Sequence, residues 1–287
     1  MISFVVPAYN ENDAVKETVL DISKALEGID HEIIVVDDGS TDQTAKYAQD
    51  AGAIVIKHPH NLGYGAALKT GIRAARFDTI AITDADGTYP NNMILELMAK
   101  YENGFNMVVG ARTGEHYNES LIKLCLRFIL KWLVEYTAGR EIPDINSGFR
   151  IFSRTEILPY YNHLCNTFSF TTSMTLAYMM THKFVTYVPI PYSKRKGKTK
   201  VRLFRDSLGT LQYIIQSILY YNPLKLFLLM SSIIFISSMV CIIVGTLLSI
   251  LSPFYIGIGG ILVSVIVFCL GLLAELLKQI LSKDIQQ

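Results

Sequence analysis

The sequence predicts an α/β domain with a mostly parallel sheet, followed by two apolar helices long enough to cross a membrane. Three observations carry this prediction. Residues 1–112 alternate short, continuous apolar runs with amphipathic helical patterns. Acidic residues stand where several of the apolar runs end. Residues 226–274 contain no Asp, Glu, Lys or Arg, although charged residues make up 18% of the chain.

Five apolar runs in the N-terminal part are predicted strands, and the amphipathic segments between them are predicted helices. Continuous rather than alternating apolar runs are typical of parallel strands that are buried on both faces. A helix after each strand covers one face or the other of such a sheet. The predicted strands span residues 3–8, 32–36, 53–56, 79–83 and 107–109. The predicted helices span residues 15–26, 44–50, 66–76 and 93–101.

Polar residues follow four of the predicted strands: 7–11, 37–38, 84–86 and Arg112. In open parallel sheets, ligands bind beyond the carboxyl ends of the strands, so these residues are expected along one rim. The acids at 37–38 suit hydrogen bonding to a base or a ribose. Ser, Thr and Asp in the next four residues also suit capping of the following helix.

Asp84 and Asp86 close the predicted strand 79–83. Residues two apart at a strand end point the same way, so both carboxylates can converge on one cation. Hard oxygen ligands suit Mg²⁺ or Mn²⁺, with the shell completed by substrate phosphates. A turn in which Asp caps the next helix explains the same residues, but the acidic rim favours the metal site.

Two further features of the N-terminal part have weaker interpretations. Gly63 and Gly65 precede a predicted helix and resemble a phosphate cradle, although the full glycine-rich dinucleotide pattern is missing. The acids at the other strand ends argue against a simple hydride-transfer site. His58 and His60 are expected to be loop or surface residues, because no third metal ligand accompanies them.

The charge-free tract 226–274 can hold two membrane spans, because one span needs about 20 apolar residues. We predict spans at about 226–250 and 256–277, separated by a break at Ser252, Pro253 and the glycines at 257–260. A buried hairpin of a soluble protein is the less favoured alternative. The predicted organisation is an N-terminal domain over residues 1–222 and a hairpin with a short tail over 223–287.

The orientation of the predicted hairpin follows from its flanking charges. Lys225 precedes the first span, Lys278 and Lys283 follow the second, and the turn between them has no charge. Positive residues are retained in the cytoplasm. We therefore expect an integral membrane protein with two spans, whose N-terminal domain and both termini face the cytoplasm.

Two amphipathic segments precede the hairpin. In 118–137, basic or acidic residues recur at every fourth position and form one polar stripe on a mostly apolar helix, which suits a membrane interface. A core helix with one solvent-exposed edge fits this stretch equally well. The second segment, 204–221, leads into the first span.

A basic run without any acid lies between these two segments, over residues 193–205. It is either a juxtamembrane segment held on anionic lipid or a loop that closes over phosphates. The two roles are compatible. Its basic residues are Lys194, Arg195, Lys196, Lys198, Lys200, Arg202 and Arg205.

The motifs, in this order, resemble family 2 glycosyltransferases with the GT-A fold: VVPAYNE at 5–11, VVDDGS at 35–40 and DAD at 84–86. DINSGFR at 144–150 and RKGKTK at 195–200 are similar to the polyprenyl-phosphate glycosyltransferases, the dolichyl-phosphate mannose synthase group. The resemblance covers about residues 3–225, and the two C-terminal spans match bacterial-type members. It implies metal-dependent, inverting transfer of a sugar from a nucleotide diphosphate sugar, UDP- or GDP-linked, to a polyprenyl phosphate of undecaprenyl or dolichyl type at the cytoplasmic face.

The resemblance also implies roles for individual residues. Asp86 is the main metal ligand with Asp84 beside it, and Arg112 faces the phosphates at the reaction centre. The donor site comprises Pro7, Tyr9, Glu11, Asp38, Asp84, Ala85 and Lys200. The acceptor and phosphate site comprises Arg127, Ser147, Gly148, Arg150, Lys194 and Arg195.

Two departures from relatives matter, and a third observation concerns a different class of synthase. Thr88 stands where dolichol-type enzymes often have Gln as a further metal ligand, so we expect a shell richer in water. Lys194 stands where relatives have Arg, with Arg195 next to it. Trp132, the only Trp, lacks the surrounding motif of processive synthases, which argues against a polysaccharide polymerase.

The expected partners are the nucleotide sugar, the lipid phosphate and the membrane, with a homo-oligomer as a further possibility and no nucleic acid. One alternative is a glycosyltransferase with a hydroxyl acceptor, for which Asp144 is the candidate base. Another is a non-catalytic subunit that binds nucleotide sugars, against which the intact acids at the strand ends argue.

Overall fold

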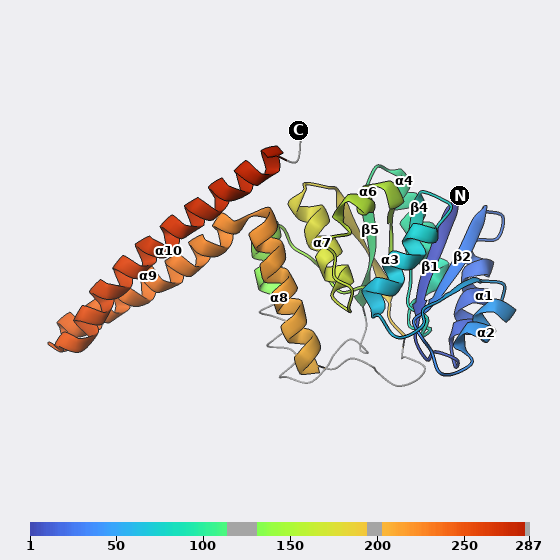
Figure 1. Ribbon diagram of the computed structural model, residues 1–287, viewed down its shortest axis with the longest axis horizontal. Helices are drawn as coiled ribbons and strands as arrows, with labels where there is room; N and C mark the ends of the chain where they lie inside the picture. Colours follow the sequence, from blue (N-terminus) through green and yellow to red (C-terminus); the bar gives the residue numbers. More distant parts are fainter. Residues whose placement is uncertain (114–130, 194–202, 285–287) are drawn as a thin grey trace. The chain divides into compact units, whose positions relative to one another are not determined.

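The computed structural model describes residues 1–113, 131–193 and 203–284. It contains two units, Met1–Ile214 and Ile215–Gln287, each of which is described by itself. The first unit is built on one sheet with the strand order β3-β2-β1-β4-β6-β5-β7 (Figure 1). The strands are β1 Ile2–Ala8, β2 His31–Asp37, β3 Ile54–Lys57, β4 Thr79–Ile82, β5 Met107–Thr113, β6 Arg150–Ser153 and β7 Val185–Pro191.

The helices of the first unit alternate with the first five strands, as the sequence predicts. Each predicted strand and helix of residues 1–112 is present, with ends shifted by a few residues. A further helical stretch covers 131–138. The helices are α1 Val15–Ala25, α2 Thr44–Asp50, α3 Tyr64–Ala74, η1 Asn91–Met93, α4 Ile94–Glu102, α6 Arg154–Ile157, η3 Leu158–Tyr160 and α7 Phe170–Met180. A further helix, α8 Leu203–Tyr221, begins in the first unit and ends in the second.

The sheet is mixed, because one strand runs against its neighbours. β1 pairs in parallel with β2 and β4, and β2 pairs in parallel with β3. β6 lies antiparallel between β4 and β5, while β5 and β7 are parallel. Two antiparallel steps restore the direction, so β4 and β5 point the same way. The predicted parallel sheet therefore extends across β6, which the sequence analysis did not include.

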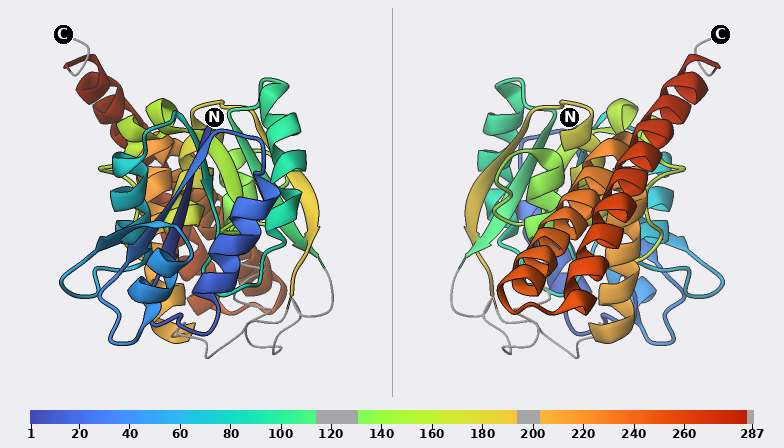
Figure 2. Two further views of the ribbon diagram at one scale, coloured as in Figure 1. Left: turned by 90° about the vertical axis from the view of Figure 1, so that its right-hand side faces the viewer. Right: turned by 90° about the vertical axis from the view of Figure 1, so that its left-hand side faces the viewer.

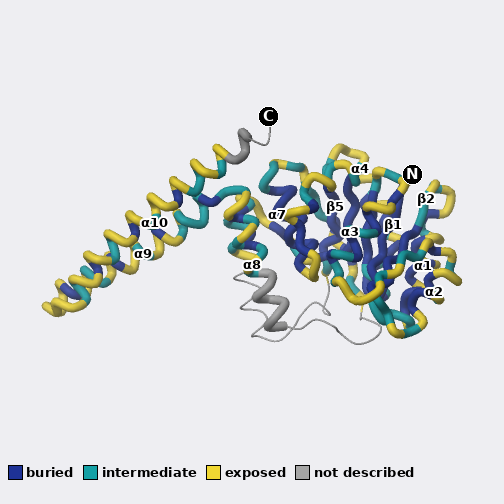
Figure 3. The backbone as a smooth tube through the Cα atoms, viewed as in Figure 1, coloured by how far each residue is buried: buried dark blue, intermediate teal, exposed yellow. Residues whose placement is uncertain are grey.

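Helices cover both faces of the sheet, which confirms the interpretation of the continuous apolar strands. Phe4 and Val6 of β1 belong to the core cluster with residues of α1 and α4. Val5, which points to the other face, lies so close to Gly71 of α3 that a Cβ there would overlap it. Figure 2 shows helices on either side of the strands, and Figure 3 shows the strands as the buried part of the unit.

The second unit contains the two helices predicted from the charge-free tract. α9, Pro223–Leu247, has 25 residues and spans about 38 Å at 1.5 Å per residue. α10 runs over Leu251–Asp284, and both helices are long and apolar enough to cross a membrane. Most of their large apolar side chains are exposed (Figure 3).

The predicted break between the spans is wrong. The turn lies at 248–250, and Ser252, Pro253 and the following glycines belong to α10. Pro253 is tolerated because it stands in the first turn of the helix, where backbone N–H groups lack intrahelical partners. Gly257 faces α9 closely: a Cβ there would lie 2.5 Å from Ile242 and 2.6 Å from the carbonyl oxygen of Ser238. Glycine here permits close helix packing rather than a turn.

This packing makes a prediction with a control two residues away. Gly257→Ala should destabilise the hairpin by about 1–3 kcal/mol, because the added methyl group meets backbone atoms of α9. Gly259→Ala should be neutral, since a Cβ at Gly259 has no neighbour within 4 Å among the described residues. Thermal unfolding of the detergent-solubilised protein measures the difference. Equal melting temperatures for the two variants would contradict the packing.

Candidate active site

The strand register brings the predicted polar strand ends to one edge of the sheet. Ala8, the last residue of β1, pairs with Asp37, the last residue of β2. Ile82 at the end of β4 and Val109 in β5 both pair with Arg150, the first residue of β6. The loop that enters β6 therefore lies at the same rim as the ends of β1, β2, β4 and β5. The predicted common rim is confirmed.

The end of β1 is tied to the turn that follows β2. The backbone N–H of Asn10 donates to the Ser40 hydroxyl at 2.9 Å, and that of Glu11 donates to Thr44 Oγ1 at 2.8 Å. Asn10 returns the contact, because its side-chain oxygen accepts from the N–H of Thr41 at 2.8 Å. Among the other candidates here, Pro7 is buried in β1 and Tyr9 is half-buried. The loops after β1 and β2 are therefore joined by hydrogen bonds at the rim.

Asp38 is buried and its carboxylate is occupied by the protein. It accepts from the backbone N–H groups of Leu62 at 2.9 Å and Gly63 at 2.8 Å. His58 contacts the same carboxylate through Nδ1 at 2.7 Å and reaches Thr70 through Nε2 at 3.0 Å. His58 lies in the loop after β3, as expected, but its side chain is 8% exposed and does not lie on the surface. Asp38 holds the loop between β3 and α3 against the rim.

The two glycines of the predicted phosphate cradle, Gly63 before α3 and Gly65 within its first turn, lie against other parts of the protein. The N–H of Gly63 is donated to Asp38, and the N–H of Ala66 is donated to the carbonyl oxygen of Asn166 at 3.0 Å. A Cβ on Gly63 would lie 2.6 Å from that carbonyl oxygen. The glycines therefore let the chain around Asn166 cover the start of α3, and the N–H groups of Gly63 and Ala66 are used within the protein.

Residues 84–88, the acid turn after β4, are held by hydrogen bonds within the turn and from α1. Asp86 is 5% exposed, and its Oδ1 accepts from the hydroxyl of Thr88 at 2.6 Å and from its N–H at 3.2 Å. Ala85 between the two acids is buried, and its carbonyl oxygen accepts from Thr18 at 3.3 Å. Thr88 is fully buried, so it acts as a support for Asp86. The sequence predicts only that Thr88 lacks the ligand group of Gln and does not indicate this supporting role.

Asp84 is the more accessible acid and is held by Tyr64, which the sequence analysis did not select. The Tyr64 hydroxyl donates to Asp84 Oδ1 at 2.9 Å. Gly148 passes beside both groups, and a Cβ on it would lie 2.8 Å from Asp84 Oδ1 and 2.9 Å from the Tyr64 oxygen. The N–H of Gly148 donates to the Tyr89 hydroxyl at 2.8 Å. Gly148 is therefore required where the acid turn meets the loop before β6.

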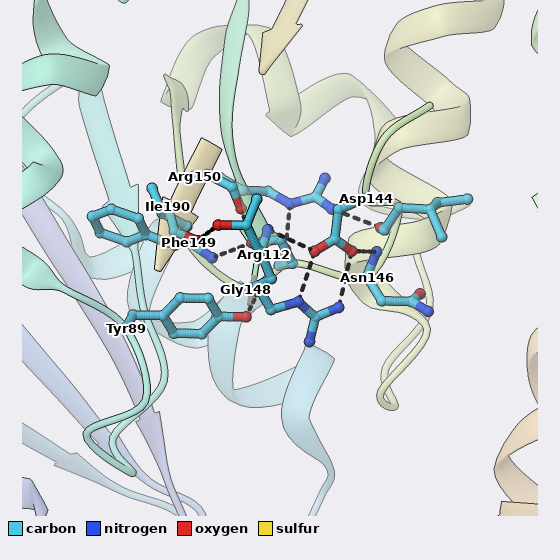
Figure 4. Close-up of polar contacts among 12 residues, drawn as sticks. Tyr89, Arg112, Asp144, Asn146, Gly148, Phe149, Arg150 and Ile190 are labelled. Atoms are coloured by element: carbon cyan, nitrogen blue, oxygen red, sulfur yellow. Dashed lines mark hydrogen bonds and ion pairs between the residues drawn. The ribbon is translucent and has the colours of Figure 1, made fainter. Parts of the chain in front are cut away.

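Arg112 and Asp144 form a bidentate ion pair at the rim (Figure 4). Arg112 Nε lies 2.7 Å from Asp144 Oδ2, and its second terminal nitrogen lies 2.9 Å from Oδ1. Burial opposes ionisation of Asp144, but the hydrogen bonds and charge of Arg112 outweigh it and lower the pKa of this carboxyl. The Arg112 guanidinium also lies 5.3 Å from the centre of the Tyr192 ring.

Ser147 and Arg150 are fully buried, and the protein uses their polar groups. The Ser147 hydroxyl donates to the Gly110 carbonyl at 2.5 Å. Arg150 donates to the carbonyl oxygens of Ser147 at 2.7 Å and Ile145 at 2.8 Å, and to the hydroxyl of Thr175 at 2.7 Å. Figure 4 shows this guanidinium beside the Asp144 loop. These contacts support the loop from behind rather than facing a ligand.

The end of β7 joins the acid turn to the basic run. The N–H of Ser193 donates to the Thr88 carbonyl oxygen at 3.0 Å. The Tyr192 ring meets Tyr89 edge-on at 5.5 Å. The candidates Arg127, Lys194, Arg195 and Lys200 lie outside the described residues, as does most of the predicted helix 118–137.

The acid turn suits a divalent cation whose coordination shell is completed by a substrate. Within the described ranges, no group of three or more His, Cys, Asp or Glu side chains is placed to hold a metal. Asp84 and Asp86 offer two hard carboxylates. Mg²⁺ commonly takes one or two carboxylates and fills its remaining positions with water and phosphate oxygens.

An α/β sheet with a turn of paired acids at its carboxyl edge fits the GT-A class of fold. Residues 3–168 match the model of glycosyl transferase family 2. The chain belongs to this family and is a glycosyltransferase.

Curated relatives extend the likeness. An uncharacterized protein of Methanocaldococcus jannaschii is 38% identical over 159 residues, which is 53% of this chain and 64% of that protein. The chain thus spans just under two thirds of that relative. The undecaprenyl-phosphate 4-deoxy-4-formamido-L-arabinose transferase of Salmonella choleraesuis is 28% identical over 242 residues, covering 81% of this chain and 72% of that enzyme.

Solved structures share the fold. Glucosyl-3-phosphoglycerate synthase from Mycobacterium tuberculosis, in complex with phosphoglyceric acid, superposes with a TM-score of 0.63 at 21% identity. It covers 76% of this chain and 79% of its own. The same enzyme in complex with Mn²⁺, UDP and phosphoglyceric acid gives a TM-score of 0.60 at 21% identity, with 76% and 78% covered.

The Arg112–Asp144 pair predicts a pH-dependent stability. Asp144→Asn should cost about 3 kcal/mol at pH 7, because it leaves a largely buried guanidinium without its charge partner. A lowered carboxyl pKa stabilises the fold above the ordinary Asp value and loses that effect as pH falls through the lowered pKa. The difference between variant and wild type should therefore shrink below about pH 3.9.

Urea unfolding at pH 7 and pH 3 measures this difference. Asp30→Asn is the control, since Asp30 is 61% exposed and lies 3.6 Å from an exposed Arg76. Its effect should stay under about 1 kcal/mol at either pH. A pH-independent loss in Asp144→Asn would mean that packing, rather than charge, holds the pair.

Proposed function

We propose that this chain transfers a sugar from a nucleotide diphosphate sugar to a polyprenyl phosphate at the cytoplasmic face of a membrane. One observation carries the proposal. The Thr88 carbonyl oxygen in the acid turn accepts a hydrogen bond from the N–H of Ser193, the first residue of the basic run. The acids suited to a metal and the first residue of the run suited to phosphate are therefore connected by a hydrogen bond. The relative that matches 81% of this chain is named for transfer to undecaprenyl phosphate.

The donor is assigned to the rim at the ends of β1, β2 and β4. The nucleoside would lie against Pro7, Tyr9 and Glu11, with Asp38 acting through the loop that it holds. The donor phosphates would meet Asp84, Ala85 and Asp86. Solved neighbours with the same fold contain Mn²⁺ or Mg²⁺ together with UDP, which supports a divalent metal here. The bound metal would neutralise charge on the departing nucleoside diphosphate.

The acceptor assignment rests on the state of Asp144. A hydroxyl acceptor must lose a proton, so it needs a base at the sugar. Asp144 is bound by two nitrogens of Arg112 and has a lowered pKa, which makes it a poor base. A lipid phosphate is already an anion near neutral pH and needs no base. Its attack requires positioning and charge stabilisation, which Arg112 and the basic run can supply.

The apolar parts of the chain fit a lipid acceptor. In the described part of the predicted interfacial helix, Trp132 is 45% exposed and stacks on Tyr136 at 5.6 Å. Aromatic side chains of this kind favour the membrane interface. With α9 and α10 as spans, the prenyl tail stays in lipid while its phosphate reaches the rim. A single in-line displacement would invert the anomeric centre.

A donor screen tests the function. Purified protein with undecaprenyl or dolichyl phosphate, Mg²⁺ and a panel of UDP- and GDP-sugars should give an organic-extractable labelled lipid. Mild acid should release the sugar, because a sugar phosphodiester is labile where an ordinary glycoside is not. A labelled lipid that resists mild acid would favour a hydroxyl acceptor. No product with any donor would overturn the proposal.

Asp86 provides the test of metal dependence. Asp86→Ala should lower transfer at least about 100-fold, because charge on the leaving group is no longer neutralised. Binding of Mn²⁺ in the presence of nucleoside diphosphate, followed by electron paramagnetic resonance, should weaken in parallel. Asp21→Ala, an exposed change on α1, is the control and should match wild type. Activity of Asp86→Ala without added metal would contradict the assignment.

A further inference from the structure

An exposed aromatic ring stands beside the acid turn, outside every group assigned so far. Phe168 is 45% exposed, and its ring lies parallel to that of Tyr64, with centroids 5.5 Å apart and planes 4° apart. Tyr64 in turn donates its hydroxyl to Asp84 at 2.9 Å. Three side chains thus lead in series from the acid turn to an accessible ring.

The loop that carries Phe168 is braced on α3. Lys69 of α3 donates to the Leu164 carbonyl oxygen at 2.6 Å and to the Asn166 side-chain oxygen at 2.7 Å. The Asn166 carbonyl oxygen accepts from Ala66 at the start of α3. An apolar ring on a loop fixed in this way has a defined position, which is what a contact with a ligand requires.

Tyr64 is fixed at both ends. Gly148 leaves room for its hydroxyl beside Asp84, and Phe168 packs on its ring. The hydroxyl donates a hydrogen bond to Asp84, so Tyr64 links the ring of Phe168 to the acid turn.

We propose that Phe168 is the platform on which the sugar ring of the donor stacks, and that Tyr64 is a positioning residue that aligns this platform with Asp84. The inference rests on the proposed function. Asp84 is assigned to the donor phosphates, and the sugar is bonded to the outer phosphate. The nucleoside is assigned to the ends of β1 and β2. The accessible ring that stacks on Tyr64, which itself contacts Asp84, is thus left for the sugar, whose C–H face packs on an aromatic ring.

The test compares donors with and without their sugar. Calorimetric titrations with Mg²⁺ use UDP-glucose against UDP and GDP-mannose against GDP, whichever pair wild type binds. Phe168→Ala should weaken binding of the nucleotide sugar about 3- to 10-fold and leave the nucleoside diphosphate unchanged. Phe168→Tyr keeps a ring and should match wild type. Phe184→Ala is the control, because Phe184 is 67% exposed and precedes β7 at the opposite edge of the sheet.

Tyr64→Phe separates positioning from contact. It keeps the stacked ring but removes the hydrogen bond from Tyr64 to Asp84, so nucleotide sugar and nucleoside diphosphate should weaken by the same factor. Tyr161→Phe is its control, since that hydroxyl has no hydrogen-bond partner among the described residues. If Tyr64→Phe binds both ligands like wild type, Tyr64 is only packing.

Three results would overturn the platform. The first is that Phe168→Ala binds the nucleotide sugar like wild type, and the second is that it weakens both ligands equally, as loss of nucleobase stacking would. The third is that Phe168→Leu, which keeps apolar volume without a ring, binds the nucleotide sugar like wild type. Failure of the proposed function looks different. In that case wild type itself binds no nucleotide sugar or transfers none to the lipid phosphate.

Discussion

The buried guanidinium of Arg150 is the interaction on which the candidate site depends. β6 runs antiparallel between β4 and β5, so its first residue lies at the edge where those two strands end. A charged residue inside a sheet is costly unless its donors are used, and Arg150 binds two carbonyl oxygens of the loop that precedes it. That loop carries Asp144 and Gly148. The same contacts that satisfy a buried charge therefore set the position of the partner of Arg112 and the close approach of Gly148 to Asp84.

Much of the first half of the fold was predictable, because continuous apolar runs and helical periods are local properties. The strand-end acids were predictable for the same reason: parallel strands bring their ends to one edge. β6, α7 and β7 were not predicted. Nothing local in 150–153 indicates an antiparallel insertion, and α7 is buried nearly all round, so it lacks an amphipathic pattern. The error at the hairpin turn has a related cause, since glycine serves both turns and close helix packing.

The site residues that the sequence did not indicate are mostly supports. Tyr64, Tyr89 and Thr88 each hold a group that was predicted, through hydrogen bonds that depend on tertiary register. One local signal existed: Tyr64 stands between two glycines at the start of α3, and glycines there permit a close approach to the backbone. Asp38 and Arg150 show the converse. Asp38 is predicted to bind the nucleoside and Arg150 the acceptor. The charged groups of both are hydrogen-bonded to other parts of the protein.

Charge balance links the two halves of the proposed reaction. The rim contributes the carboxylates of Asp84 and Asp86 toward an anionic donor, an arrangement that repels phosphate unless cations are added. Arg112 offsets part of this charge, but Asp144 already takes up two of its nitrogens. The basic residues that follow Ser193 are a further source of positive charge, and the Thr88 carbonyl oxygen binds the N–H of Ser193. On the proposed function, an anionic acceptor is then favoured twice: it needs no base, which Asp144 cannot provide, and it is attracted by the same basic residues that the donor requires.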